Sequence, residues 1–68
     1  HCSMRVYETA DGLQLWTFPS GYIPTRRKSR CFLLWDYTAE RGYKFMTRKE
    51  AASFLRSFRR MLSKVLDQ

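Results

Sequence analysis

The chain has little of what catalytic sites and metal sites require. Its one histidine, His1, lies ahead of Met4, so a Cys–His or Ser–His–Asp site has no base, and its three glycines form no phosphate-binding loop. Asp36 and Glu40 are a carboxylate pair that a hairpin could bring together, and salt bridges to neighbouring cations explain them better than acid–base or metal chemistry. We therefore predict a protein that is not an enzyme and that uses no metal and no cofactor.

Cysteine is also scarce, and long apolar runs are absent. We expect residues 1–3, which include Cys2, to be a remnant added ahead of Met4, the natural start of translation. The remaining thiol, Cys31, offers no disulfide framework and fits a reducing compartment. No apolar stretch approaches the roughly 20 residues of a membrane span. The sequence thus predicts one small cytoplasmic domain over residues 4–68, with no membrane partner.

Acidic residues are few, whereas basic and aromatic residues are abundant. Six Asp and Glu stand against 13 Lys and Arg, which leaves a net charge of +7 and a pI near 10.0. Such a surface favours an anionic partner, either nucleic acid or an acidic protein surface. The 11 aromatic residues help to build a core in so short a chain, because each buries a large apolar area.

The pattern of apolar residues predicts an antiparallel sheet. Four extended segments are expected, at residues 5–7, 13–18, 31–37 and 43–46. Asp11-Gly12 is a hairpin signal between the first two, and residues 38–42 connect the last two, with Gly42 able to take a positive φ. In the second segment Leu13, Leu15 and Thr17 share one face. Both of its faces carry apolar groups, so the pattern leaves open which face is buried.

Residues 47–66 predict a capped amphipathic helix. Thr47 and Glu50 are spaced as a capping box, in which the Glu50 carboxylate reaches back to the Thr47 N–H. The apolar residues that follow recur at helical spacing; they are Ala51, Phe54, Leu55, Phe58, Met61, Leu62 and Val65. The expected fold is α+β, an antiparallel sheet of three to four strands with one C-terminal amphipathic helix packed on one face.

Basic side chains are the candidate binding residues. Arg26, Arg27, Lys28 and Arg30 form a cluster in a predicted loop, where flexible cations suit phosphate contacts. Further candidates lie in the turn before the last strand, on that strand and on the helix; they are Arg41, Lys44, Arg56, Arg59 and Arg60. We predict a non-enzymatic nucleic-acid-binding module in which the basic loop and the sheet edge contact phosphates.

Aromatic residues on an uncovered sheet face leave a second function open. Candidates for that face are Trp16, Phe18, Tyr22, Phe32 and Tyr43, and all of them could also be buried. Exposed aromatics beside Arg and Lys stack nucleobases or form a protein contact patch. The alternative is therefore a small protein-interaction module or inhibitor that docks on an acidic partner or forms a homodimer through this face.

The run from Tyr43 to Leu55 resembles part of a known group of DNA-binding modules. Phe45, Thr47, Glu50 and Ala51 form the motif aromatic-x-Thr-x-x-Glu-Ala, in which a capped helix follows a strand. The layout is similar to that of the arm-binding domains of phage-type integrases and of the plant AP2 domain. In those families a three-stranded sheet enters the major groove of DNA and a C-terminal helix braces its back. The resemblance implies DNA as the partner, with Lys44 and Arg41 facing it beside the 26–30 cluster.

Overall fold

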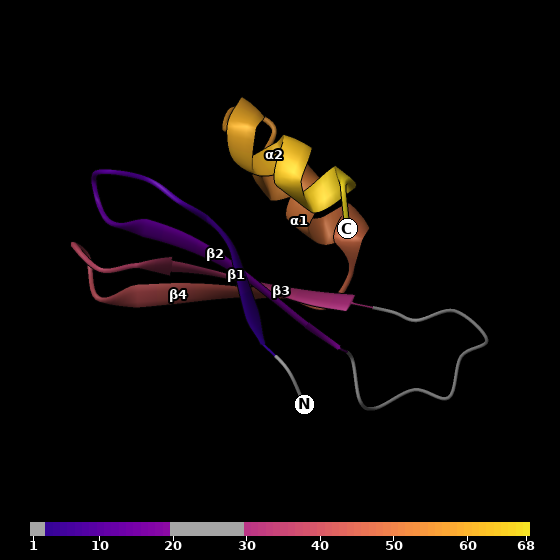
Figure 1. Ribbon diagram of the computed structural model, residues 1–68, viewed down its shortest axis with the longest axis horizontal. Helices are drawn as coiled ribbons and strands as arrows, with labels where there is room; N and C mark the ends of the chain where they lie inside the picture. Colours follow the sequence, from indigo (N-terminus) through magenta and orange to yellow (C-terminus); the bar gives the residue numbers. More distant parts are fainter. Residues whose placement is uncertain (1–2, 20–29) are drawn as a thin grey trace.

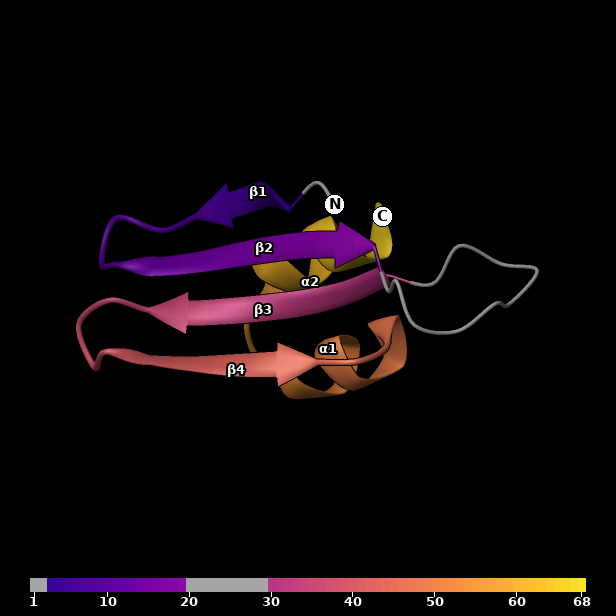
Figure 2. The same ribbon diagram turned by 90° about the horizontal axis from the view of Figure 1, so that it is seen from below.

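The protein folds as one antiparallel sheet with two short helices on one of its faces. The computed structural model describes residues 3–19 and 30–68. The elements in chain order are β1 (Met4–Glu8), β2 (Leu13–Pro19), β3 (Arg30–Asp36), β4 (Arg41–Phe45), α1 (Arg48–Phe54) and α2 (Arg59–Leu66). The strand order is β1-β2-β3-β4, and each pair of neighbours is antiparallel. Both helices lie on the same side (Figure 1), and Figure 2 shows the sheet from the opposite side. The predicted α+β class is confirmed.

The predicted single helix is wrong, because the chain breaks it into α1 and α2. Leu55 leaves the helical conformation at ψ 16°, and the Phe58 N–H donates to the Leu55 carbonyl in a tight turn. Four strands about 4.8 Å apart make a sheet roughly 14 Å wide. One helix is only about 10 Å across. The break lets α1 pack on β3 and β4 while α2 packs on β1 (Figure 2), so two short helices cover a sheet that one straight helix could not.

One of the two hydrogen bonds predicted for the cap of α1 forms, and the other has a different donor. The Glu50 N–H donates to Thr47 Oγ1 over 3.1 Å. The Glu50 carboxylate accepts from the N–H of Met46 over 3.0 Å, one residue earlier than a capping box requires. Thr47 is extended at φ −137°, so α1 starts directly after the end of β4. The cap thereby fixes the point at which the chain passes from β4 into α1.

The core lies between the helices and one face of the sheet. Its buried members are Leu15, Phe32, Leu34, Phe45, Ala51, Leu55, Met61 and Val65, at 0–8% exposure. Burying a side chain such as leucine stabilises the fold by about 1.5–3 kcal/mol. Thr17 is also fully buried, and its hydroxyl donates to the Cys31 carbonyl over 3.1 Å, so the core holds no unsatisfied hydroxyl there.

Of the β1–β2 and β3–β4 turns, only the first has its positive φ at the predicted glycine. Gly12, in the β1–β2 turn, has φ 98°, as the Asp-Gly signal predicts. In the β3–β4 turn the positive φ belongs to Glu40, at 53°, and the prediction for Gly42 is wrong. The Asp36 carboxylate accepts from the N–H groups of Thr38 and Ala39, which tightens this turn and leaves Gly42 inside β4. Gly42 is therefore required for another reason, given below.

A bulge in β1 separates its side chains between the two faces. Arg5 pairs with Trp16, but the register then shifts, so that Tyr7 pairs with Leu15. As a result Val6 and Tyr7 both pack against the core. Arg5 stays with Trp16 on the side away from the helices. The extra residue of the bulge lets two consecutive side chains face the core, whereas strict alternation would place them on opposite faces.

Candidate nucleic-acid interface

The helices leave one face of the sheet uncovered, and we call it the open face. Its side chains alternate with the core residues along each strand; they are Arg5, Glu8, Gln14, Trp16, Phe18, Cys31, Leu33, Trp35 and Lys44. Trp16, Phe18, Leu33 and Trp35 are half-buried and belong neither to the core nor to the hydrophobics packed against it. The open face therefore carries apolar rings that the two helices do not cover.

A row of side chains crosses the open face with a cation at each end. The register pairs Arg5 with Trp16, Trp16 with Leu33, and Leu33 with Lys44. Arg5 and Lys44 lie on the two outer strands, and both are exposed. Adjacent strands are about 4.8 Å apart, so the two positions are roughly 14 Å apart across the sheet. A cation thus lies on each side of a central apolar strip, and Arg5 is also paired with Glu8 on the same face.

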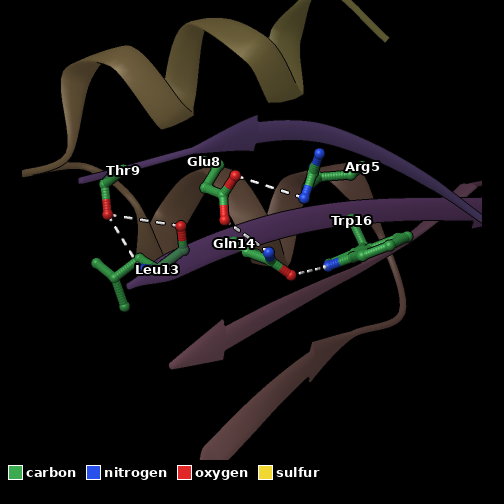
Figure 3. Close-up of polar contacts among 6 residues, drawn as sticks. All are labelled: Arg5, Glu8, Thr9, Leu13, Gln14 and Trp16. Carbon is green, nitrogen blue, oxygen red and sulfur yellow. Dashed lines mark hydrogen bonds and ion pairs between the residues drawn. The ribbon is translucent and has the colours of Figure 1, made fainter. Parts of the chain in front are cut away.

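A chain of polar contacts holds Trp16 in place. The Trp16 indole Nε1 donates to Gln14 Oε1 over 3.0 Å, and Gln14 Nε2 donates to Glu8 Oε2 over 2.7 Å. The other Glu8 oxygen is 3.4 Å from Arg5 Nη1. Figure 3 shows these four side chains in sequence across β1 and β2. Both amide atoms of Gln14 are used, and its side chain is almost fully buried.

Trp35 and Phe18 are also positioned by their neighbours. A Cβ added at Gly42 would lie 2.9 Å from Trp35 Cε3 and 3.3 Å from Leu33 Cδ1, so the absent side chain makes room for both. Trp35 also meets Tyr37 edge to face, with ring centroids 5.8 Å apart. Lys44 Nζ lies 5.5 Å from the centroid of the Phe18 ring, within the range of a cation–π contact.

The candidate cations from the sequence do not gather on one surface. Arg26, Arg27 and Lys28 lie outside the described residues. Arg30 and Arg41 start β3 and β4, at opposite ends of this strand pair, and alternate with the residues of the open face. Arg30 Nε donates to the buried Thr17 Oγ1 over 3.2 Å, which gives it a structural role.

The helix cations lie in the helical layer, behind the sheet. Arg56 is in the connection between α1 and α2, and Arg59 and Arg60 form the first turn of α2; all three are exposed. The N-cap residue of α2, Phe58, makes no side-chain capping bond. Two cations at this end of a helix are opposed by its dipole. Of the described candidates, Lys44 alone lies on the open face.

The predicted aromatic residues separate between the two faces. Trp16 and Phe18 lie on the open face, as one alternative allowed, whereas Phe32 is fully buried in the core and Tyr43 packs against it. Tyr22 lies outside the described residues. The sequence did not predict Arg5 as a site residue. Its position beside Trp16 depends on the bulge in β1, and alternation of residues along a strand does not reveal a bulge.

Two pKa shifts are present at the turns. A hydrogen bond from Arg41 Nη1 to the Tyr43 hydroxyl, 3.3 Å long, raises the pKa of the Arg41 guanidinium, which therefore stays charged. A hydrogen bond with Thr9 lowers the pKa of the Asp11 carboxyl. Within residues 3–19 and 30–68, no three His, Cys, Asp or Glu side chains are grouped to hold a metal ion. Neither helix is long and apolar enough to cross a membrane.

Two hollows lie away from the open face. One, of about 710 Å³, lies beside α1, where Lys49 and Glu50 line it with opposite charges. The other, of about 210 Å³, is lined by Arg59 and Arg60 together with Tyr7 and Thr9. Comparisons with protein-family models, curated proteins and solved structures give no match to this chain. The candidate interface therefore depends on geometry and charge.

Proposed function

We propose that this protein is a non-enzymatic nucleic-acid-binding module. The observation that carries the proposal is the row from Arg5 through Trp16 and Leu33 to Lys44, which combines an indole ring and an aliphatic side chain with a cation on each outer strand. Phosphates are attracted to the cations, and bases to the apolar strip between them. The net charge of +7 supports the same partner, because it attracts a polyanion over the whole surface.

Salt dependence of binding tests this proposal. Fluorescence anisotropy with labelled single-stranded and duplex DNA and RNA should show affinity that falls steeply as salt rises. The slope of log K against log [salt] is about −0.7 to −0.9 per phosphate contact. Lys44→Gln should weaken binding and make the slope shallower by about one contact. Lys64→Gln removes the same charge from the helical layer and is the matched control. Absence of binding to every nucleic acid at low salt would overturn the proposal.

The loop cluster is tested separately, from the sequence. We expect the triple variant Arg26→Ala, Arg27→Ala, Lys28→Ala to bind nucleic acid more weakly and with a shallower salt slope. Arg30 is kept in this variant because it donates to buried Thr17, and its removal would disturb the core. Unchanged affinity in the triple variant would remove the loop from the proposed interface and leave the open face.

The second candidate function is protein interaction through the same face. The half-buried Trp16, Phe18, Leu33 and Trp35 favour it, because uncovered apolar side chains also form protein contacts. Light scattering coupled to size-exclusion chromatography distinguishes the two functions. A dimer that dissociates on Leu33→Lys substitution, in a protein that binds no nucleic acid at low salt, would favour this second candidate.

A further inference from the structure

The open face has several rings that can recognise base faces, and the side chains on it that could donate to base edges are Arg5 and Lys44. Among its described side chains, Gln14 is the one neutral amide, and both of its polar atoms already bond within the protein. Glu8 is likewise engaged by Gln14 and Arg5. Edge readout in a duplex groove requires free donors and acceptors. Stacking requires only an apolar ring, and every base has a π-face.

The rings on this face are held before any ligand binds. Trp16 is oriented by its hydrogen bond to Gln14, and Trp35 lies between the Gly42 backbone and Tyr37. Rings fixed in place lose less conformational freedom when a base stacks on them. In a duplex, however, the base faces are already stacked on one another and are closed to a protein ring. Rings of this kind therefore favour unpaired bases.

The charged side chains of the open face narrow the kind of ligand that it can bind. Arg5 and Lys44 flank the apolar strip, so a strand that crosses the sheet can place bases on the strip and phosphates near both cations. A second copy of this chain fits less well, because two molecules of charge +7 would bring their Arg5 and Lys44 side chains to the same interface. The partner that matches both the rings and the cations is a polyanion with accessible bases.

We infer that the open face binds single-stranded nucleic acid, with unpaired bases stacked on Trp16, Phe18 and Trp35. This inference rests on the proposed function and narrows it from nucleic acid in general to unpaired strands. It also departs from the groove-binding sheet that the sequence resemblance implies, because the face presents rings where groove readers present free polar groups.

Three probes test the inference, and the two single strands among them carry the same charge. They are an oligothymidylate of about 12 nucleotides, within the usual site size for a single strand, an abasic strand of the same length, and a duplex of the same length. Binding is followed by anisotropy at low salt and by quenching of tryptophan fluorescence. The oligothymidylate should bind at least about tenfold more tightly than the abasic strand, and it alone should quench strongly.

Substitutions then locate the stacking rings. Trp35→Leu and Trp16→Leu should each weaken binding of the oligothymidylate by about fivefold to hundredfold, with little effect on the abasic strand. Phe58→Leu is the matched control, because Phe58 is an exposed aromatic in the helical layer. Trp35→Phe keeps a ring and should retain most of the affinity. Circular dichroism confirms that each variant folds. If a Leu variant unfolds, the comparison of the oligothymidylate with the abasic strand still tests stacking, because it uses the unsubstituted protein.

The outcomes separate the inference from the function on which it rests. Equal affinity for the abasic strand and the oligothymidylate, or quenching of tryptophan fluorescence by the duplex as strong as by the oligothymidylate, overturns the stacking inference and leaves nucleic-acid binding intact. Failure of all three probes to bind at low salt overturns both. A stable dimer whose interface includes Leu33 and Trp35, with no quenching by the oligothymidylate, assigns the face to a second copy and also overturns the inference.

Discussion

The two faces of the sheet are built from the same strands and differ in how deeply their apolar side chains are buried. On the helix side Leu15, Phe32 and Leu34 are 0–3% exposed, and helical residues complete their contacts. On the open face Trp16, Leu33 and Trp35 are half-buried, and no helix or strand of residues 3–19 and 30–68 lies over them. The first arrangement stabilises the fold through burial. The second holds rings in fixed positions at the surface, which suits recognition.

The largest difference between the faces should appear in stability. Leu15→Ala creates a cavity in the core and should lower the free energy of unfolding by about 2–5 kcal/mol. A chain of this size has a total of about 3–10 kcal/mol, so the variant should be close to unfolding. Leu33→Ala, directly beside Trp16 on the open face, should lower it by about 1 kcal/mol or less. Urea denaturation measures both. Equal losses would contradict the distinction and indicate that the open face is covered in solution.

The next effect concerns the room that Gly42 leaves for Trp35. Gly42→Ala places a methyl group 2.9 Å from the indole, so the ring must move. We expect a loss of about 1–3 kcal/mol in stability and a shifted tryptophan emission spectrum. In a Trp35→Leu background the side chain beside Gly42 is smaller, so Gly42→Ala should cause a smaller loss of stability. A double-mutant cycle measures this coupling, and additive losses would show that Trp35 does not lie against Gly42.

A smaller effect should follow from cutting the polar chain to Trp16. Gln14→Leu removes the acceptor of the indole N–H and the amide that binds Glu8. Loss of these hydrogen bonds should lower stability by about 1–2 kcal/mol and broaden the range of Trp16 orientations. Single-strand affinity should fall with it, while Glu8→Gln, which keeps an acceptor for Gln14, should have a weaker effect. Unchanged affinity in Gln14→Leu would show that ring orientation does not matter for binding.

The smallest expected effect on stability is a gain, and it lies in the helical layer. Arg60→Glu places an acidic group in the first turn of α2, where the helix dipole favours it, and should stabilise the fold by about 0.3–1 kcal/mol. Nucleic-acid affinity should change far less than in Lys44→Glu, which reverses the same charge on the open face. Thermal melts and anisotropy measure the pair. Equal losses of affinity would place the helix cations in the interface as well.

The repeating parts of the fold are predictable from the sequence. Alternation identifies the strand of residues 13–18, Asp11-Gly12 identifies its hairpin, and Thr47 with Glu50 identifies the start of α1, because each depends on residues close together in the chain. The break after Leu55 is not predictable in this way. It follows from the width of the sheet that the helices must cover, and the sequence at the break contains neither Gly nor Pro.

The candidate site is predictable only in part, for a similar reason. Composition indicates an anionic partner, and Trp16, Phe18 and Lys44 were already among the candidates. Which face they occupy depends on where the helices pack, and the contribution of Arg5 depends on the bulge in β1. Cations that are close in sequence, such as Arg59 and Arg60, lie in a different layer from Lys44. Sequence proximity thus groups charges that tertiary structure separates.

The strand order β1-β2-β3-β4 also has a consequence for how the protein folds. Every pairing joins strands that are neighbours in the chain, so the sheet can assemble one hairpin at a time. The helices follow the sheet in chain order, and α2 must return to β1 to close the core. During synthesis, the sheet sequence therefore leaves the ribosome before the helices that distinguish its two sides. The two faces of the sheet become different only when both helices have packed on one of them.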